Sequence, residues 1–252
     1  MAYTIFADNL VEAEWFRELS PRVRAAQYRQ IGERGANPAA VEDLIRYDRP
    51  DIVLLDDQRP VLVLEKTREV PTGHNVGQRF ARLVRSTEAG ITTVKFFPFD
   101  ARKHGDYSAI CNLNIRLIRA FERMTEIHRV PVLAVNWPAD EHGELLDDGR
   151  ENDRVRAVVH DFLGRGHDKD APEIMRQQEF MRQEYKARLR RHPPYDKPPS
   201  SVQVMKTSSI KISRRIVDGV DPAGFDRRAN ALVYTMDMTP SKCRREDPYT
   251  GT

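Results

Sequence analysis

The chain has 252 residues, of which 40% are hydrophobic and 31% charged, so it can form one large domain or a core with a modest appendage. No apolar run approaches the ~18 residues of a membrane-spanning helix, and the first residues lack the basic and apolar regions of a signal peptide. Two cysteines, Cys111 and Cys243, cannot form a disulfide framework. We therefore expect a cytoplasmic protein with no membrane partner.

Helices and strands are predicted to alternate in the first part of the chain. Helical spacing of apolar residues predicts one or two helices over 9–34 and a short helix over 38–46. Two apolar, β-branched runs then predict a hairpin. Its strands cover 51–56 and 61–67, and they are followed by a helix over 76–89, a strand over 92–98, a helix over 112–128 and a strand over 130–135. This order predicts an α/β fold, a mixed sheet with an antiparallel hairpin and flanking helices.

The composition changes near residue 140, and we divide the chain there into a core of 1–140 and a basic α+β region of 141–252. The second region either packs on the core or forms its own unit. Its predicted elements are an acidic loop over 140–153, helices over 153–163 and 172–191, a proline-rich stretch over 192–199, and strands over 202–216 and 231–236.

Basic residues are concentrated between 176 and 215, where Lys and Arg clearly outnumber the acidic residues. Arg182, Lys186 and Arg190 are spaced to share one face of a helix. A second group lies among serines and threonines: Lys206, Lys211, Arg214 and Arg215. A solvated helix face would explain the first group alone, but the two adjacent groups together favour contacts with DNA phosphates.

The predicted hairpin places two carboxylates together. A three-residue loop at 57–59 brings Asp51 opposite Glu65, with Cβ atoms ~5 Å apart. Facing carboxylates repel, so a fold keeps them only with a cation, a shared proton or water between them. Mg²⁺ binds one or two carboxylates and retains several waters, which suits phosphodiester cleavage. The alternative is that both are ordinary strand-end residues; Asp56 and Asp57 are most simply turn formers.

The stretch RPDIVLLDDQRPVLVLEKT resembles the PD-(D/E)XK nuclease superfamily, which includes many type II restriction endonucleases. Pro50-Asp51 starts one strand, Glu65 lies near the end of the next, and a helix and a strand follow, so the resemblance covers residues 40–100. It implies a metal-dependent nuclease in which Asp51 and Glu65 bind Mg²⁺. By the same resemblance, the backbone carbonyl of Lys66 would be a third ligand.

The lysine of this motif is displaced. The family has it two residues after the acid, where this chain has Thr67, and Lys66 comes one residue early. Strict alternation along a strand points Lys66 away from Glu65, although a β-bulge at 65–66 would turn it back. Lys95, on the next strand, is the second candidate, and a site without lysine is the third. The lysine would hold the attacking water and offset phosphate charge.

A polar loop after Glu65 leads into the helix predicted over 76–89. The resemblance implies that this helix borders the active site, so His74, Asn75 and Gln78 are candidate DNA contacts, with backbone N–H groups at the helix start suited to a phosphate. The alternative is that Asn75 only caps the helix and His74 is a surface residue.

Taken together, these features lead us to expect a sequence-specific, Mg²⁺-dependent endonuclease of the type II restriction kind, acting on double-stranded DNA as a homodimer. Another nuclease of the superfamily, in repair or RNA processing, is one alternative. A catalytically decayed nucleic-acid-binding module is another. A small-molecule α/β enzyme is disfavoured because the sequence has no Gly-rich phosphate loop, nucleophile elbow or zinc-type Cys/His spacing.

Overall fold

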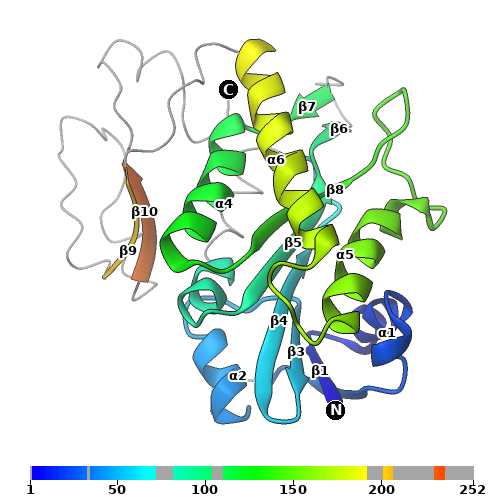
Figure 1. Ribbon diagram of the computed structural model, residues 1–252, viewed down its shortest axis with the longest axis vertical. Helices are drawn as coiled ribbons and strands as arrows, with labels where there is room; N and C mark the ends of the chain where they lie inside the picture. Colours follow the sequence, from blue (N-terminus) through cyan, green and yellow to red (C-terminus); the bar gives the residue numbers. More distant parts are fainter. Residues whose placement is uncertain are drawn as a thin grey trace.

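A computed structural model of the chain describes residues 2–32, 35–71, 82–103, 110–191, 201–206 and 230–235. Its centre is a six-stranded mixed sheet, which confirms the predicted α/β class (Figure 1). In spatial order the strands are β2 (Gln27–Gln30), β1 (Tyr3–Ala7), β3 (Ile52–Asp56), β4 (Arg59–Lys66), β5 (Thr92–Pro98) and β8 (Val132–Trp137). Strand β3 is antiparallel to β1 and β4, whereas β4, β5 and β8 run parallel to one another.

Helices flank this sheet. They are α1 (Leu10–Glu18), α2 (Ala39–Leu44), a helical stretch at 82–88, α4 (Ile115–His128), α5 (Asp153–Gly164) and α6 (Pro172–Arg191), with 3-10 turns η1 (Pro21–Val23) and η2 (Arg150–Asn152). Two small sheets pair β6 (Asp100–Arg102) with β7 (Ile110–Asn112) and β9 (Ser201–Lys206) with β10 (Asn230–Thr235). None of the helices within the described ranges is long and apolar enough to cross a membrane.

The helical prediction over 9–34 is wrong in its second half. After α1, Ser20 caps a 3-10 turn that begins at Pro21, and residues Gln27–Gln30 form edge strand β2 parallel to β1. This edge strand is almost entirely polar and mostly exposed, so it carries none of the apolar alternation that predicts a strand.

Two hydrophobic clusters lie on opposite faces of the sheet. Ile52 and Leu54 of β3 belong to a large cluster with residues of α1, α4, α5 and α6, whereas Val53 and Leu55 belong to a smaller cluster with α2. Successive residues of a strand point to opposite faces, so the continuous apolar run of β3 is buried on both sides.

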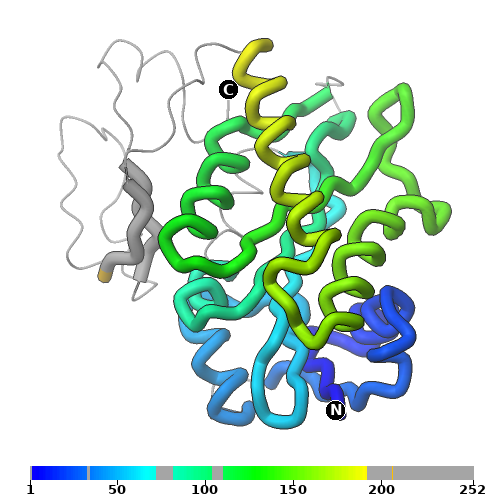
Figure 2. Tube along the Cα trace, viewed as in Figure 1, coloured from blue at the N-terminus to red at the C-terminus, as the bar shows by residue number. Residues whose placement is uncertain are grey.

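The N-terminal segment packs against the later part of the chain. The Trp15 indole donates a hydrogen bond to Asn152, and the hydroxyl of Ser20 lies 3.2 Å from His160 Nδ1. Figure 2 shows the same proximity, with the blue N-terminal tube beside the yellow-green tube of α5. The helices after residue 150 therefore share a hydrophobic core with the N-terminal strands.

Helix α6 covers the outer edge of strand β8. The Gln177 amide donates to the Ala134 carbonyl at 2.6 Å, and the Ala134 N–H group donates to the Met181 sulfur at 3.3 Å. Backbone groups of an edge strand would otherwise need water or another strand. Two side chains of α6 therefore complete the backbone hydrogen bonding of Ala134 on the outer edge of β8.

The β3–β4 hairpin has the expected pairing of Asp51 and Glu65, but its turn differs from the predicted three-residue loop. Asp57 and Gln58 form a two-residue turn, with Asp57 at φ 54°, and Asp56 pairs with Arg59. A register shift between Leu54 and Leu55 then restores the pairing that a three-residue loop would have produced, so that Ile52 pairs with Leu64. Asp51 and Glu65 are the next residues in that register.

Candidate active site

Asp51 and Glu65 converge on one cationic atom. Arg82 Nη1 lies 3.0 Å and 3.3 Å from the two Glu65 carboxylate oxygens and 3.5 Å from Asp51 Oδ1. Asp51 directly precedes β3 and Glu65 is the penultimate residue of β4, so the hairpin register brings them together. The structure thus juxtaposes the two carboxylates that the sequence predicted as neighbours.

Burial raises the pKa values of Asp51 and Glu65 well above their usual range. Burial raises the pKa of Asp51 to about 6, although the Lys66 N–H group, which donates to Asp51 Oδ2 at 2.7 Å, and Arg82 both act to lower it. Burial and then repulsion from Asp51 raise the pKa of Glu65 to about 7, against the attraction of Arg82 and Lys95. Both shifts mean that the folded protein resists ionising the pair.

Arg82 supplies the main counter-charge. It lies at the start of the helical stretch 82–88, and its Nε donates to Asp48 Oδ2 at 3.3 Å. Burial opposes its charge, but Glu65, Asp48 and Asp51 outweigh burial and raise its pKa. Its contact with both carboxylates was not predicted from the sequence, although a buried carboxylate pair requires a cation and Arg82 is on the helix that follows the hairpin.

The two lysines lie on opposite faces of the sheet. Pairing of β4 with β5 continues through Glu65 and Lys66 without a register shift, so the bulge that would turn Lys66 toward Glu65 does not form. Lys66 Nζ is instead 3.3 Å from Glu12 Oε2 and 4.4 Å above the Trp15 ring. The placement of Lys66 beside Glu65 is therefore corrected: strict strand alternation directs its side chain to α1.

Lys95 occupies the position that Lys66 was expected to fill. It pairs with Glu65 in the parallel register of β4 and β5, which puts both side chains on the same face of the sheet. Its side chain is fully buried, and its charge lowers the pKa of Glu65. Lys95 beside Glu65 therefore joins Asp51 and Arg82 as the third ionisable group that acts on Glu65.

The donor set of this cluster suits a hard divalent cation. Within the ranges that the structure describes, no three His, Cys, Asp or Glu side chains converge to hold a metal ion. Mg²⁺ requires only one or two carboxylates because it keeps several of its waters. Asp51 and Glu65 are such a pair, and their common contact with Arg82 Nη1 demonstrates that one positive centre reaches both.

The predicted nucleic-acid contacts are only partly within the described residues. His74, Asn75, Gln78, Lys211, Arg214 and Arg215 lie outside those residues. Arg182, Lys186 and Arg190 are exposed on α6, as is Lys206 at the end of β9, and Arg182 is paired with Glu179 at 2.9 Å. Their role as DNA contacts stays a prediction.

Arg188, between these exposed residues, has a different role. It is buried, donates to the Leu113 carbonyl at 3.1 Å, and forms ion pairs with Asp100 at 2.8 Å and Glu184 at 2.6 Å. Part of the positive charge of α6 therefore attaches the helix to the core.

Comparison of the chain with protein-family models, with curated proteins and with solved structures finds no match.

Proposed function

We propose that the chain is a Mg²⁺-dependent endonuclease that hydrolyses phosphodiester bonds of double-stranded DNA at a specific sequence. The observation that carries this proposal is the convergence of Asp51 and Glu65 on a single positive centre, with buried Lys95 beside Glu65. The same arrangement of two strand-end carboxylates and a lysine is what the resemblance to the PD-(D/E)XK superfamily implies.

In this proposal Asp51 and Glu65 hold the metal, which when bound lowers the pKa of a water molecule and offsets charge on the phosphate. The residues of the chain perform the other tasks. Lys95 positions the attacking water next to Glu65 and balances the negative charge that develops on the phosphate. Arg82 neutralises the carboxylates without metal, and its contact with Asp48 offers it another counter-ion when it leaves them.

The proton affinities of the pair give this mechanism a pH dependence. A carboxylate binds a cation in its ionised form, and the pKa values of Asp51 and Glu65 are about 6 and about 7. Metal-dependent cleavage therefore increases as the pH rises through this interval.

Contacts with DNA are assigned to the exposed basic residues of α6, Arg182, Lys186 and Arg190, and to the segment that begins at Lys206. Salt-sensitive binding is expected because such residues displace counterions from phosphates. A homodimer would fit a DNA site with two-fold symmetry, because each protomer would contact one half of the site.

The test is cleavage of a long mixed-sequence duplex by wild type and by two variants, Asp51→Asn and Glu65→Gln, with Mg²⁺ or EDTA. Asp57→Asn is the matched control, because this exposed turn residue has a left-handed backbone that asparagine tolerates. We expect discrete fragments from wild type and the control in Mg²⁺ alone. A nonspecific smear with the same dependencies would indicate a general nuclease, and undiminished cleavage by Asp51→Asn would refute the site.

One observation favours a second candidate, a nucleic-acid-binding module that has lost catalysis. Arg82 already balances the two carboxylates from within the chain, so the pair is stable without metal. Salt-sensitive DNA binding without cleavage, together with no heat of Mg²⁺ binding by calorimetry, would support this candidate.

A further inference from the structure

A cavity of about 420 Å³ lies at the start of strand β4, at the opposite end of that strand from Glu65. Residues from four parts of the chain line it: α2, the first residues of β4, residues 89–92 at the start of β5, and the end of α5 with its connection to α6. Along β4 the strand rise puts Arg59 about 20 Å and Val61 about 13 Å from Glu65, and Glu65 does not line the cavity. The cavity is therefore separate from the proposed nuclease centre.

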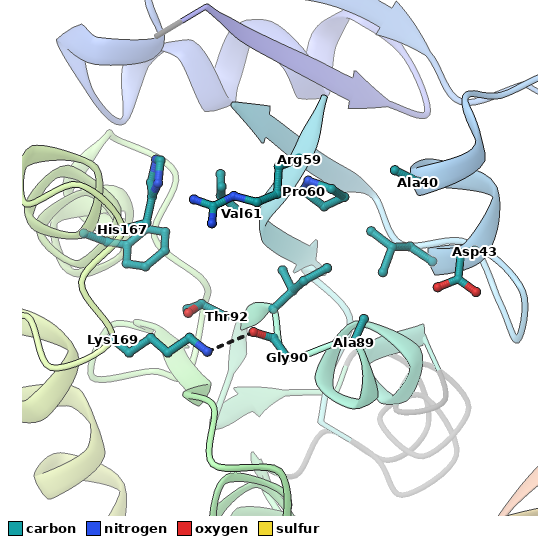
Figure 3. Close-up of a pocket in the computed structure, with 13 residues that line it drawn as sticks. Ala40, Asp43, Arg59, Pro60, Val61, Ala89, Gly90, Thr92, His167 and Lys169 are labelled. Atoms are coloured by element: carbon teal, nitrogen blue, oxygen red, sulfur yellow. Dashed lines mark hydrogen bonds between the residues drawn. The ribbon is translucent and has the colours of Figure 1, made fainter. Parts of the chain in front are cut away.

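Positive and hydrogen-bonding groups line one side of this cavity. Arg59, Thr92, His167 and Lys169 are among its lining residues (Figure 3). Lys169 Nζ donates one hydrogen bond, to the Gly90 carbonyl at 3.1 Å, and keeps two further donors. The side chain of Arg59 is exposed and makes no hydrogen bond or ion pair with any residue that the structure describes.

Thr92 gives independent evidence for a ligand. Its side chain is 2% exposed, and its Oγ1 has no hydrogen-bond partner among the described residues. Figure 3 shows this side chain between Lys169 and Arg59. An unsatisfied buried hydroxyl costs about 1–3 kcal/mol, so native proteins rarely keep one without a partner. A ligand oxygen held by the two cations would supply that partner.

Among the described residues that line the cavity, the acidic one is Asp43. Asp43 lies across the cavity and is neutralised by an ion pair with Arg85 at 2.5 Å. His167 stays neutral because burial lowers its pKa, and its Nε2 is 2.9 Å from the Tyr3 hydroxyl. Asp56, which does not line the cavity, acts on His167 in the opposite direction and raises its pKa. The remaining wall is apolar and includes Leu44, Pro60 and Ile91.

We propose that this cavity binds a small organic anion, with an oxyanion head at Arg59, Thr92 and Lys169 and an apolar body against Leu44, Pro60 and Ile91. Its volume falls within the range of small-molecule sites, about 300–1,000 Å³. An anion with an apolar body would contact both the positive and the apolar side of the cavity, whereas an inorganic ion would contact the positive side alone.

The test is isothermal titration calorimetry of the full chain with four probes: phenyl phosphate, benzoate, inorganic phosphate and phenol. We expect one saturable site for phenyl phosphate or benzoate, with a Kd below about 1 mM. Inorganic phosphate should bind at least about tenfold more weakly and phenol should not saturate, because each satisfies only one wall. The preferred head, phosphate or carboxylate, identifies the class of natural ligand.

Variants locate the binding. Arg59→Gln and Lys169→Gln should each weaken the preferred probe by about tenfold, and Thr92→Val, which keeps the shape of the side chain, by about threefold to tenfold. The matched control is Arg29→Gln, an exposed arginine on β2, which should leave the affinity unchanged. Thermal unfolding without ligand verifies that each variant folds.

Two results would overturn the proposal: no saturable binding of either organic anion, or binding that none of the three variants weakens. Asp51→Asn should bind the preferred probe with unchanged affinity. A failed anion-binding test and a failed test of the proposed nuclease centre can therefore be distinguished.

Discussion

Strand β4 has charged residues at both of its ends, and the two ends differ in how those charges are surrounded. At one end Glu65 is fully buried among Asp51, Arg82 and Lys95. At the other end Arg59 is exposed, and its guanidinium group makes no ion pair within the described part of the chain. The same strand therefore supports a closed, internally balanced charge cluster and an open, unbalanced one.

The buried cluster around Glu65 and the exposed Arg59 therefore have different effects on the protein. A buried cluster fixes its geometry but makes stability and activity depend on pH, because each member shifts the proton affinity of the others. An exposed cation contributes little to stability and is available to an external anion. Substitutions at the Glu65 end should consequently have large effects on the protein itself, and those at the Arg59 end should mainly affect a ligand.

The largest expected effect distinguishes the two lysines. Lys95→Met should lower the single-turnover cleavage rate by about 100-fold or more, since it removes the cation beside Glu65. Lys66→Met should lower it by less than about tenfold, because its side chain contacts Glu12 and Trp15 on the other face. The reverse order would mean that Lys66 moves into the site when DNA binds.

A large effect on stability is expected when the arginine is removed. Arg82→Met leaves two buried carboxylates without their main counter-charge, so the free energy of unfolding should fall by about 2–3 kcal/mol at pH 8. The loss should shrink at pH 5, where the carboxylates are protonated. Urea unfolding at both pH values measures this change.

The control for that experiment is Arg85→Met, on the same helical stretch. Arg85 pairs with the more exposed Asp43 and Glu88, so the expected loss is only about 0.5–1 kcal/mol. Equal losses for the two variants would contradict the distinct role of Arg82.

Stability of the wild type should fall as the pH rises. The pKa of Glu65 is raised from 4.5 to about 7 in the folded protein, so between these values the folded state binds more protons than the unfolded state. Its contribution to stability is complete below pH 4.5 and is lost as the pH rises to about 7. Glu65→Gln should remove about 3 kcal/mol of this pH-dependent loss of stability. Superimposable pH profiles of unfolding would argue against the raised pKa.

The smallest effect is expected at the other end of the strand. Arg59→Gln should change the free energy of unfolding by less than about 0.5 kcal/mol and leave cleavage unchanged, because the residue is exposed and unpaired within the described chain. A larger loss of stability would mean that Arg59 has a structural partner and that the two ends of β4 are more alike than described.

Much of the fold follows from local sequence patterns. The strands β3, β4, β5 and β8 are runs of apolar and β-branched residues, and α4, α5 and α6 have helical spacing of apolar residues, so each was predicted close to its observed position. Strand β2 was missed because its residues are polar and its pairing with β1 depends on tertiary contacts.

The geometry of the candidate site was predicted in part. Asp51 and Glu65 were paired from an assumed three-residue loop, whereas the chain uses a two-residue turn and a register shift that together give the same pairing. A sequence does not reveal such compensation. The choice of Lys95 over Lys66 depends on whether a bulge forms, and the contact of Arg82 with both carboxylates depends on how its helix packs.

The attachment of α6 to Ala134 has a consequence for self-association. Sheets can join edge to edge only through strands whose backbone groups are free, and Gln177 and Met181 already occupy those of Ala134. Addition of a further strand at β8 would require α6 to detach there. Strand exchange or sheet extension between two copies of the chain would instead involve β2, where Arg29 places an exposed charge on the opposite edge.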